Sequence, residues 1–297
     1  MILWGLIFVL STMVWAQRPE GVLDGPPWAK VASEAIENER FDEALVLLQS
    51  EPNSTLDSVW KGYLTGLIEI EQGQLEAAEA SLKGAREITQ EISDESLSNR
   101  LLSRVQRKLG LVERKRGDYD ASRRMHYTAF DLAQKYGSAE EEHDCLISID
   151  VDCYYLQDWS ESERVLRESL EVAAQISDPV ERTRAQATSN NNLAGTLSEE
   201  HNFEEAQEKA QAALAAWEEW ENMTGDRTEF RAGWAHYTLA DVYLAWAKSL
   251  AAENALEASN KRGMAKYELL AMTALAREAN RPQSDFDEIN RRLKECE

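Results

Sequence analysis

The sequence predicts an all-α protein, a right-handed solenoid of about six helical hairpins with a C-terminal capping helix. Proline is rare, with 6 among 297 residues and none in residues 53–178 or 180–281, so long uninterrupted helices are allowed. Ala, Glu, Leu, Gln and Arg dominate the middle of the chain, and these are good helix formers. A short motif also recurs five times among apolar residues at helical spacing, which indicates repeated amphipathic hairpins.

Each copy of the motif has a turn-prone or polar pair, a large apolar residue, two mostly polar residues and then a small residue. The small residues are 34, 44, 40 and 44 residues apart and are Ala44, Ala78, Ser122, Ser162 and Ala206. In the helical segment before the motif an apolar residue stands beside a small one, as in Leu109-Gly110 and Leu193-Ala194. Small residues at these points let two antiparallel helices approach closely, so we expect the five small residues to be buried between paired helices.

These motifs resemble the tetratricopeptide repeat (TPR) over about residues 26–215. The periods of 40–44 residues are similar to those of the longer-helix repeats of kinesin light chain and related adaptors. The sequence departs from the repeat in two respects: the glycine of the turn remains only at Gly73 and Gly117, and Asp150 stands at a position that is usually small. The resemblance implies stacked hairpins whose first helices line a concave groove for a peptide or a partner's helix.

The repeat pattern is harder to follow towards the C-terminus. Residues 234–243 resemble a further first helix, and its partner helix contains Tyr267. Pro282 then interrupts the pattern before a short terminal helix, whose polar outer face suits the end of a solenoid. We therefore predict a TPR-like solenoid over residues 28–280 and a C-terminal capping helix over residues 281–297.

The N-terminus is predicted to be a cleavable secretory signal over residues 1–16, followed by a flexible lead over residues 17–27. Residues 1–16 carry no charged side chain, and their apolar run is shorter than the roughly 20 residues that span a bilayer. Val14 and Ala16 place small residues at the two sites that a signal peptidase reads. No Lys or Arg precedes the run, so an uncleaved apolar anchor stays an alternative. Cleavage implies an exported protein, in the periplasm or the external medium, that keeps no membrane span.

The balance of charges limits the classes of partner. With 32 Lys and Arg against 54 Asp and Glu, the net charge is −22, which disfavours nucleic acid and anionic membranes because both repel a negative surface. The three cysteines, Cys145, Cys153 and Cys296, cannot form an even disulfide framework, and the first two are interpreted as small buried residues. We therefore expect a protein or peptide as the partner, and the oligomeric state stays open.

The most distinctive local feature is a basic segment, residues 100–124, in which nine basic residues outnumber three acidic ones. Arg104, Arg107 and Lys108 are predicted to contact a partner, and an acidic group would suit them because charge-assisted hydrogen bonds hold a carboxylate in a partly dry groove. By resemblance, Arg104 and Lys108 occupy two of the five positions with which chaperone-tail clamps hold a peptide carboxylate. The three positions that do not match are Ala29, Ser33 and Leu64. The alternative is a solvated basic face that balances neighbouring acidic helices.

Two further groups are candidates for partner contacts. Asn191 and Asn192 lie in a run that resembles the kinesin light chain repeats, and Asn192 stands where peptide-binding TPRs place an asparagine to pair with ligand backbone. An amide can donate and accept, so it can hold an extended peptide without reading its sequence. The alternative is that it caps a helix or faces water. Trp60 and Tyr63 are predicted to line the groove or the first interface, with a core position as the alternative.

No catalytic, cofactor or metal site is predicted. The four histidines lie in different repeats, and the common catalytic and phosphate-binding motifs do not occur in the sequence. The acidic stretch at residues 140–145 does not converge at ligand spacing and is better explained as a charged first helical turn. We expect a non-catalytic exported scaffold or adaptor. The alternatives are an accessory or regulatory domain with a small-molecule or metal site that supports an enzyme or transport complex, and self-association through the solenoid ends.

Overall fold

The structure is a computed structural model that describes residues 25–49, 54–227 and 230–297. Every regular element in these described ranges is an α-helix, and together they form 13 helices. The predicted all-α class, a series of helical hairpins followed by a terminal helix, is confirmed. The predicted signal over residues 1–16 and the first part of the predicted lead lie outside the described residues.

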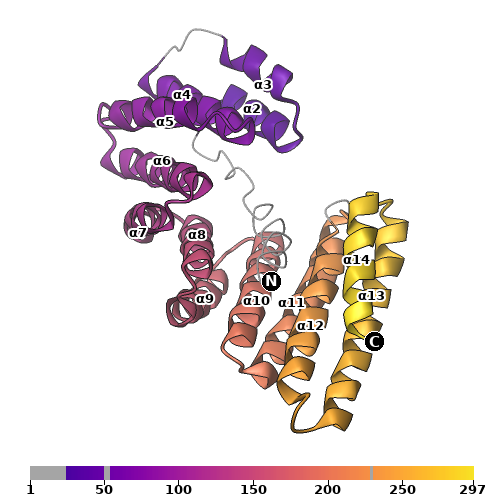
Figure 1. The fold of residues 1–297 in the computed structure, drawn as a ribbon. Coiled ribbons are helices and arrows are strands. Elements are labelled where there is room, and N and C mark those ends of the chain that lie inside the picture. Colours follow the sequence, from indigo (N-terminus) through magenta and orange to yellow (C-terminus); the bar gives the residue numbers. More distant parts are fainter. Residues whose placement is uncertain (1–24, 50–53, 228–229) are drawn as a thin grey trace. The chain divides into compact units, whose positions relative to one another are not determined.

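The chain divides into two compact units, Met1–Gln157 and Asp158–Glu297. The helices of the first unit are α2 (Pro27–Glu37), α3 (Phe41–Leu48), α4 (Thr55–Glu71), α5 (Leu75–Thr89), α6 (Glu95–Arg116), α7 (Tyr119–Tyr136) and α8 (Ala139–Leu156). Within this unit each helix packs on the next, and the first helices α2, α4, α6 and α8 also meet their counterparts in the neighbouring hairpins (Figure 1). The unit is therefore a stack of hairpins.

The second unit is built in the same way. Its helices are α9 (Trp159–Ala173), α10 (Pro179–Glu199), α11 (Phe203–Thr224), α12 (Arg231–Leu250), α13 (Ala255–Glu278) and α14 (Gln283–Glu295). Consecutive helices pack against each other, α10 also contacts α12, and α14 packs on the hairpin of α12 and α13 (Figure 1). Each amphipathic helix thus buries its apolar face against neighbours rather than in one central core.

The five small residues of the repeat are buried, as predicted. Each is the fourth residue of a second helix and has no exposed surface; they are Ala44, Ala78, Ser122, Ser162 and Ala206. Five residues before each of them the backbone has a positive φ, at Glu39, Gly73, Gly117, Gln157 and His201. The left-handed residue ends one helix and turns the chain into the next. The turn geometry is therefore kept where glycine is lost, at a cost of about 1–2 kcal/mol for each non-glycine residue.

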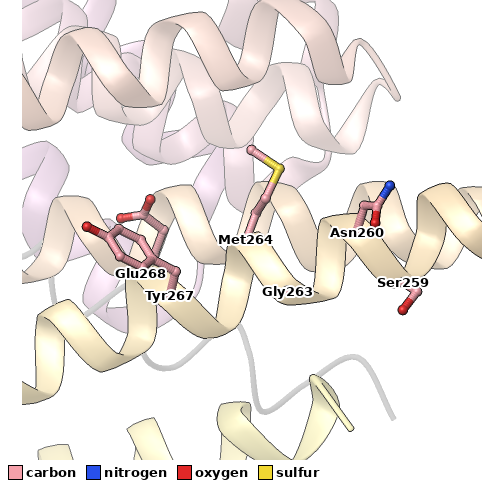
Figure 2. Close-up of a pocket in the computed structure, with 6 residues that line it drawn as sticks. All are labelled: Ser259, Asn260, Gly263, Met264, Tyr267 and Glu268. Carbon is pink, nitrogen blue, oxygen red and sulfur yellow. The ribbon is translucent and has the colours of Figure 1, made fainter.

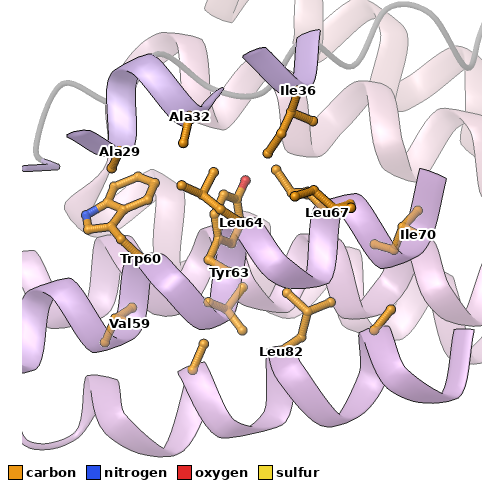
Figure 3. Close-up of a cluster of buried hydrophobic side chains, with 14 of the residues drawn as sticks. Ala29, Ala32, Ile36, Val59, Trp60, Tyr63, Leu64, Leu67, Ile70 and Leu82 are labelled. Atoms are coloured by element: carbon orange, nitrogen blue, oxygen red, sulfur yellow. The ribbon is translucent and has the colours of Figure 1, made fainter. Parts of the chain in front are cut away.

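A cluster of apolar side chains joins the first two hairpins. Figure 3 shows side chains of α2 facing those of α4, with α5 on the other side of α4; the labelled residues are Ala29, Ala32, Ile36, Val59, Trp60, Tyr63, Leu64, Leu67, Ile70 and Leu82. Gly66 of α4 lies against Leu82 of α5 so closely that an added Cβ would come within 2.7 Å of the leucine Cγ. This is the close helix approach that the small residues predict.

The terminal helix α14 is held on α12 by polar contacts. Arg292 donates from Nη2 to Asp241 Oδ2 (2.7 Å) and from Nε to the hydroxyl of Tyr237 (3.0 Å), and Tyr237 donates to Glu288 (2.5 Å). The other side of α14 is exposed and polar, with Gln283, Asp287, Asn290, Arg291 and Lys294. A helix of this kind suits the end of a stack of hairpins because it covers apolar surface and faces water.

This contact predicts a pH dependence. Burial raises the pKa of Asp241 to about 6, although Arg292 opposes the shift. Because the folded state then binds this proton more tightly than the unfolded state, the contribution of Asp241 to the free energy of unfolding should decrease by roughly 2–3 kcal/mol as the pH rises from 4 to 6. Asp241→Asn should remove this slope in thermal denaturation followed from pH 4 to 8. Asp287→Asn changes an exposed carboxylate of α14, outside this contact, and should keep the slope.

Candidate functional site

The candidate site of the first unit lies on the first helices of three successive hairpins. Arg104 of α6 places its guanidinium carbon 5.5 Å from the ring centroid of Trp60 on α4. The same guanidinium contacts Glu141 Oε1 of α8 through Nε and Nη2, both at 2.6 Å. Arginine can stack on an aromatic ring while its forked donors bind a carboxylate, so one side chain links three helices.

Trp60, Arg104 and Glu141 form a row across the three helices, and the start of α8 positions the Glu141 carboxylate. Ser138 is the N-cap, and Glu141 completes a capping box in which its Oε2 accepts from the backbone N–H of Ser138 (2.9 Å). Acidic residues fill the first turn, as the sequence predicts, where the helix dipole favours negative charge. Arg100 of α6 also approaches Glu141 Oε2, at 3.4 Å. Glu141 is therefore the partner that the sequence analysis missed, 37 residues from Arg104.

The three predicted cations are buried. Arg104, Arg107 and Lys108 have exposed fractions of 4%, 2% and 2%. The Nη2 atom of Arg107 lies 3.7 Å from Asp144 Oδ2 of α8. Removing a cation from water is costly unless an anion accompanies it, so α8 supplies the charges that allow α6 to be basic. Arg104 and Arg107 are thus paired with an acidic helix of the same chain and are buried rather than solvated. Other basic residues of the segment, such as Lys115 and Arg124, are exposed. A role in partner binding stays a prediction.

The other predicted contacts are divided between the units. Trp60 and Tyr63 are buried, pack edge to face with centroids 5.5 Å apart and belong to the apolar cluster of the first hairpins (Figure 3). Asn191 and Asn192 lie in the second unit, in the middle of α10, where Asn192 is buried and Asn191 is half-buried. The N-cap of α10 is Asp178, so capping does not explain these asparagines. The structure brings together Trp60, Tyr63 and Arg104.

A second set of polar residues was not anticipated. Asp152 of α8 accepts from Arg114 Nε of α6 (2.7 Å) and from the hydroxyl of Ser122 on α7 (2.8 Å) at Oδ1. Its other oxygen lies 2.5 Å from Nδ1 of His126, whose Nε2 lies 3.0 Å from the carbonyl oxygen of Arg107. These contacts join α6, α7 and α8 into one buried network.

The network is closed to solvent. Ser122, His126 and Asp152 have no exposed surface. Burial alone would raise the pKa of Asp152, but the charges of Arg114 and His126 outweigh it and hold the pKa below its ordinary value. A carboxylate in this position can tie helices together, and it offers no open face to a substrate. A signal was present in the sequence, because His126 follows Ser122 by four residues, where other repeats have Leu48, Leu82 and Leu166.

The tryptophans of the second unit serve packing. Trp217 and Trp220 are buried, with ring centroids 5.9 Å apart in an edge-to-face contact. Lys261 of α13 places its ammonium 3.2 Å from the ring centroid of Trp246.

Across residues 25–49, 54–227 and 230–297, no group of three or more His, Cys, Asp and Glu side chains could hold a metal ion. No helix within those ranges is long and apolar enough to cross a membrane.

Comparisons with known proteins bear on the fold. No protein-family model and no curated protein sequence matches the chain. Solved structures do: a putative kinesin light chain from Podosopora anserina with TPR-like repeats is 14% identical, covers 74% of this chain and 96% of its own, and has a TM-score of 0.53. The fold is TPR-like.

Two other TPR-like neighbours cover more of this chain. A signal transduction ATPase with a tetratricopeptide repeat sensor from Pyrococcus horikoshii is 17% identical, covers 90% of this chain and 41% of its own, and has a TM-score of 0.62. A Rap protein complexed with Competence and Sporulation Factor is 16% identical, covers 91% of this chain and 73% of its own, and has a TM-score of 0.54. At these identities the likeness concerns the TPR-like fold alone.

Proposed function

We propose that this TPR-like chain is a non-catalytic scaffold or adaptor that binds a protein or peptide on the face formed by its first helices. The observation that supports this most directly is the row of Trp60, Arg104 and Glu141, which three successive hairpins contribute to one face. The Rap neighbour, solved with Competence and Sporulation Factor, is a precedent for a TPR-like fold that accommodates a partner.

The charges of the row suggest how an acidic partner would bind. Glu141 holds Arg104 at 2.6 Å, and Asp144 lies near Arg107, so both chain carboxylates occupy the places that carboxylates of a partner would take. A partner would therefore exchange with Glu141 and Asp144 and would gain the forked hydrogen bonds of arginine. In the second unit, Asn191 and Asn192 would pair with the partner's backbone through their amide groups.

The test compares partner capture by the full chain and two matched variants. Arg104→Gln removes the central cation, and we expect it to reduce recovery of the partner at least tenfold in quantitative mass spectrometry. Arg164→Gln makes the same chemical change at an exposed arginine of α9 and should leave recovery unchanged. Glu141→Gln weakens the internal competitor and should increase recovery of an acidic partner. Equal capture by all forms, with unchanged helical circular dichroism, would remove the row from the proposal.

We also propose export after cleavage of residues 1–16. The proposal rests on the uncharged apolar run and on the small residues Val14 and Ala16. Expression in the source cell, followed by intact-mass analysis, should give a chain that begins at Gln17 in the fraction outside the cytoplasm. A chain of full mass in the membrane fraction would instead support the uncleaved anchor.

A further inference from the structure

Helix α13 exposes an apolar stripe. The exposed fractions of Leu256, Tyr267 and Leu270 are 76%, 70% and 51%, and that of Met264 is 39%. Residues 256, 260, 263, 267 and 270 alternate in steps of four and three, so they lie along one face of the helix. The opposite face is buried in the second unit and contains Ala258, Ala265, Leu269, Met272 and Ala276.

The middle of the stripe is hollow. A shallow open depression of about 510 Å³ is lined there by Ser259, Asn260, Gly263, Met264, Tyr267 and Glu268 (Figure 2). A Cβ added to Gly263 would meet no atom within 4 Å. A neighbouring helix could therefore approach closely at Gly263 while large side chains pack on both sides of it.

The exposed face of α13 is symmetric about Gly263, because residues 256, 259 and 260 on one side and 266, 267 and 270 on the other are all exposed. Leu256 and Leu270 stand seven residues before and after the glycine, and Ser259 and Tyr267 stand four residues before and after it. If two such helices cross antiparallel at Gly263, Leu256 of each copy lies opposite Leu270 of the other. Tyr267 of each copy then lies over Ser259 of the other. This self-complementarity is what a two-fold interface between identical chains needs, because the same patch serves both sides.

The charge of α13 also favours a second copy. The chain carries −22, so most faces of two copies repel each other. Helix α13 is different, because outside the buried Lys261 its basic and acidic residues balance; these are Arg262, Lys266 and Arg277, and Glu257, Glu268 and Glu278. The stripe is thus a place where two copies can meet with little repulsion.

We propose that α13 is a self-association site at which two copies of this chain pair antiparallel across Gly263. The exposed face of α13 has twelve residues, about half of the 20–30 residues that each partner contributes to a standard stable interface. The dimer is therefore weak and reversible, with a dissociation constant on the order of micromolar. Because the net repulsion of the two chains opposes it, added salt strengthens the dimer.

The first test measures association of the full chain by sedimentation equilibrium from about 1 to 200 μM, at low and at high salt. Tyr267→Glu and Leu270→Glu should each weaken the dimer at least tenfold. The matched control is Val46→Glu, which places the same charge on another exposed apolar residue, 66% accessible on α3, and should leave the dimer intact. A wild-type chain that stays monomeric over this range, or a dimer that survives both α13 substitutions, overturns the proposal.

The second test reads the register by disulfide trapping in a Cys296→Ser background, because Cys145 and Cys153 are buried. Helices that cross 8–10 Å apart bring facing Cα atoms to about 3–5 Å, so Gly263→Cys should cross-link to itself. Leu256→Cys alone should not, since two copies of that residue would be about 21 Å apart. A mixture of Leu256→Cys and Leu270→Cys chains should form the mixed dimer. Self-linked Leu256→Cys chains would instead indicate a parallel pair or another partner surface.

Discussion

Asp152→Ala is expected to reduce the free energy of unfolding of the first unit by about 3–5 kcal/mol. The substitution removes the carboxylate that Arg114, Ser122 and His126 share and leaves the guanidinium of Arg114 buried without its anion. The loss should appear in urea denaturation followed by circular dichroism, and in faster hydrogen exchange of α6, α7 and α8. A decrease in the free energy of unfolding of less than about 1 kcal/mol would contradict the conclusion that this network stabilises the packing of α6, α7 and α8.

Replacing the whole network is expected to have a much smaller effect. A variant with Arg114→Met, Ser122→Ala, His126→Leu and Asp152→Leu leaves no buried group unpaired, and such apolar replacements of buried ion pairs are often neutral. The precedent within this chain is the preceding hairpin, which has Ala78 and Leu82 at the positions of Ser122 and His126. The contrast between Asp152→Ala and this variant separates the cost of an orphaned charge from the cost of changed packing.

Gly110→Ala is expected to destabilise the first unit by about 1–3 kcal/mol, although alanine is the better helix former. The added methyl group would lie 2.5 Å from Nε2 of His126. The imidazole cannot move away easily, because Asp152 contacts one nitrogen and the carbonyl oxygen of Arg107 lies 3.0 Å from the other. Urea denaturation of the variant and the wild type gives the difference.

Two controls test the cause that we assign to this effect. Gly84→Ala lies in α5 of the same unit, where an added Cβ meets no atom within 4 Å, and it should raise the free energy of unfolding by about 0.5–1 kcal/mol. In a His126→Ala background, Gly110→Ala should also become favourable, because the clashing ring is gone. If Gly110→Ala is equally harmful without the ring, the close contact with His126 is not the cause.

The architecture was readable from the sequence because it depends on local chemistry repeated many times. Small residues such as Ala44 and Ala206 recur at the fourth position of second helices and are fully buried. The turns before them are instructive: Glu39, Gln157 and His201 take the left-handed turn position without being glycine. The stacking of the hairpins imposes this conformation, so the missing glycine weakened the motif in the sequence without changing the turn.

The candidate site was predicted only in part. The sequence singled out Arg104 and Trp60, and the structure places them in contact. It did not reveal Glu141 as the partner of Arg104 or Asp152 as the partner of Arg114, because the ion pairs span 37 and 38 residues. Which carboxylate of an acidic helix reaches which cation depends on the offset between stacked hairpins, and no local pattern encodes that offset.

The sequence by itself determined the helical class, the approximate hairpin boundaries and the buried small residues, because helix propensity, apolar spacing and the size of a side chain act over one or two turns. The tertiary structure alone decided that Arg104, Arg107 and Lys108 are buried, and that Arg104 and Arg107 meet carboxylates of α8. It also decided that His126 replaces an aliphatic residue within a polar network. The reason is physical: the cost of burying a charge depends on which atoms surround it, and those atoms come from distant parts of the chain.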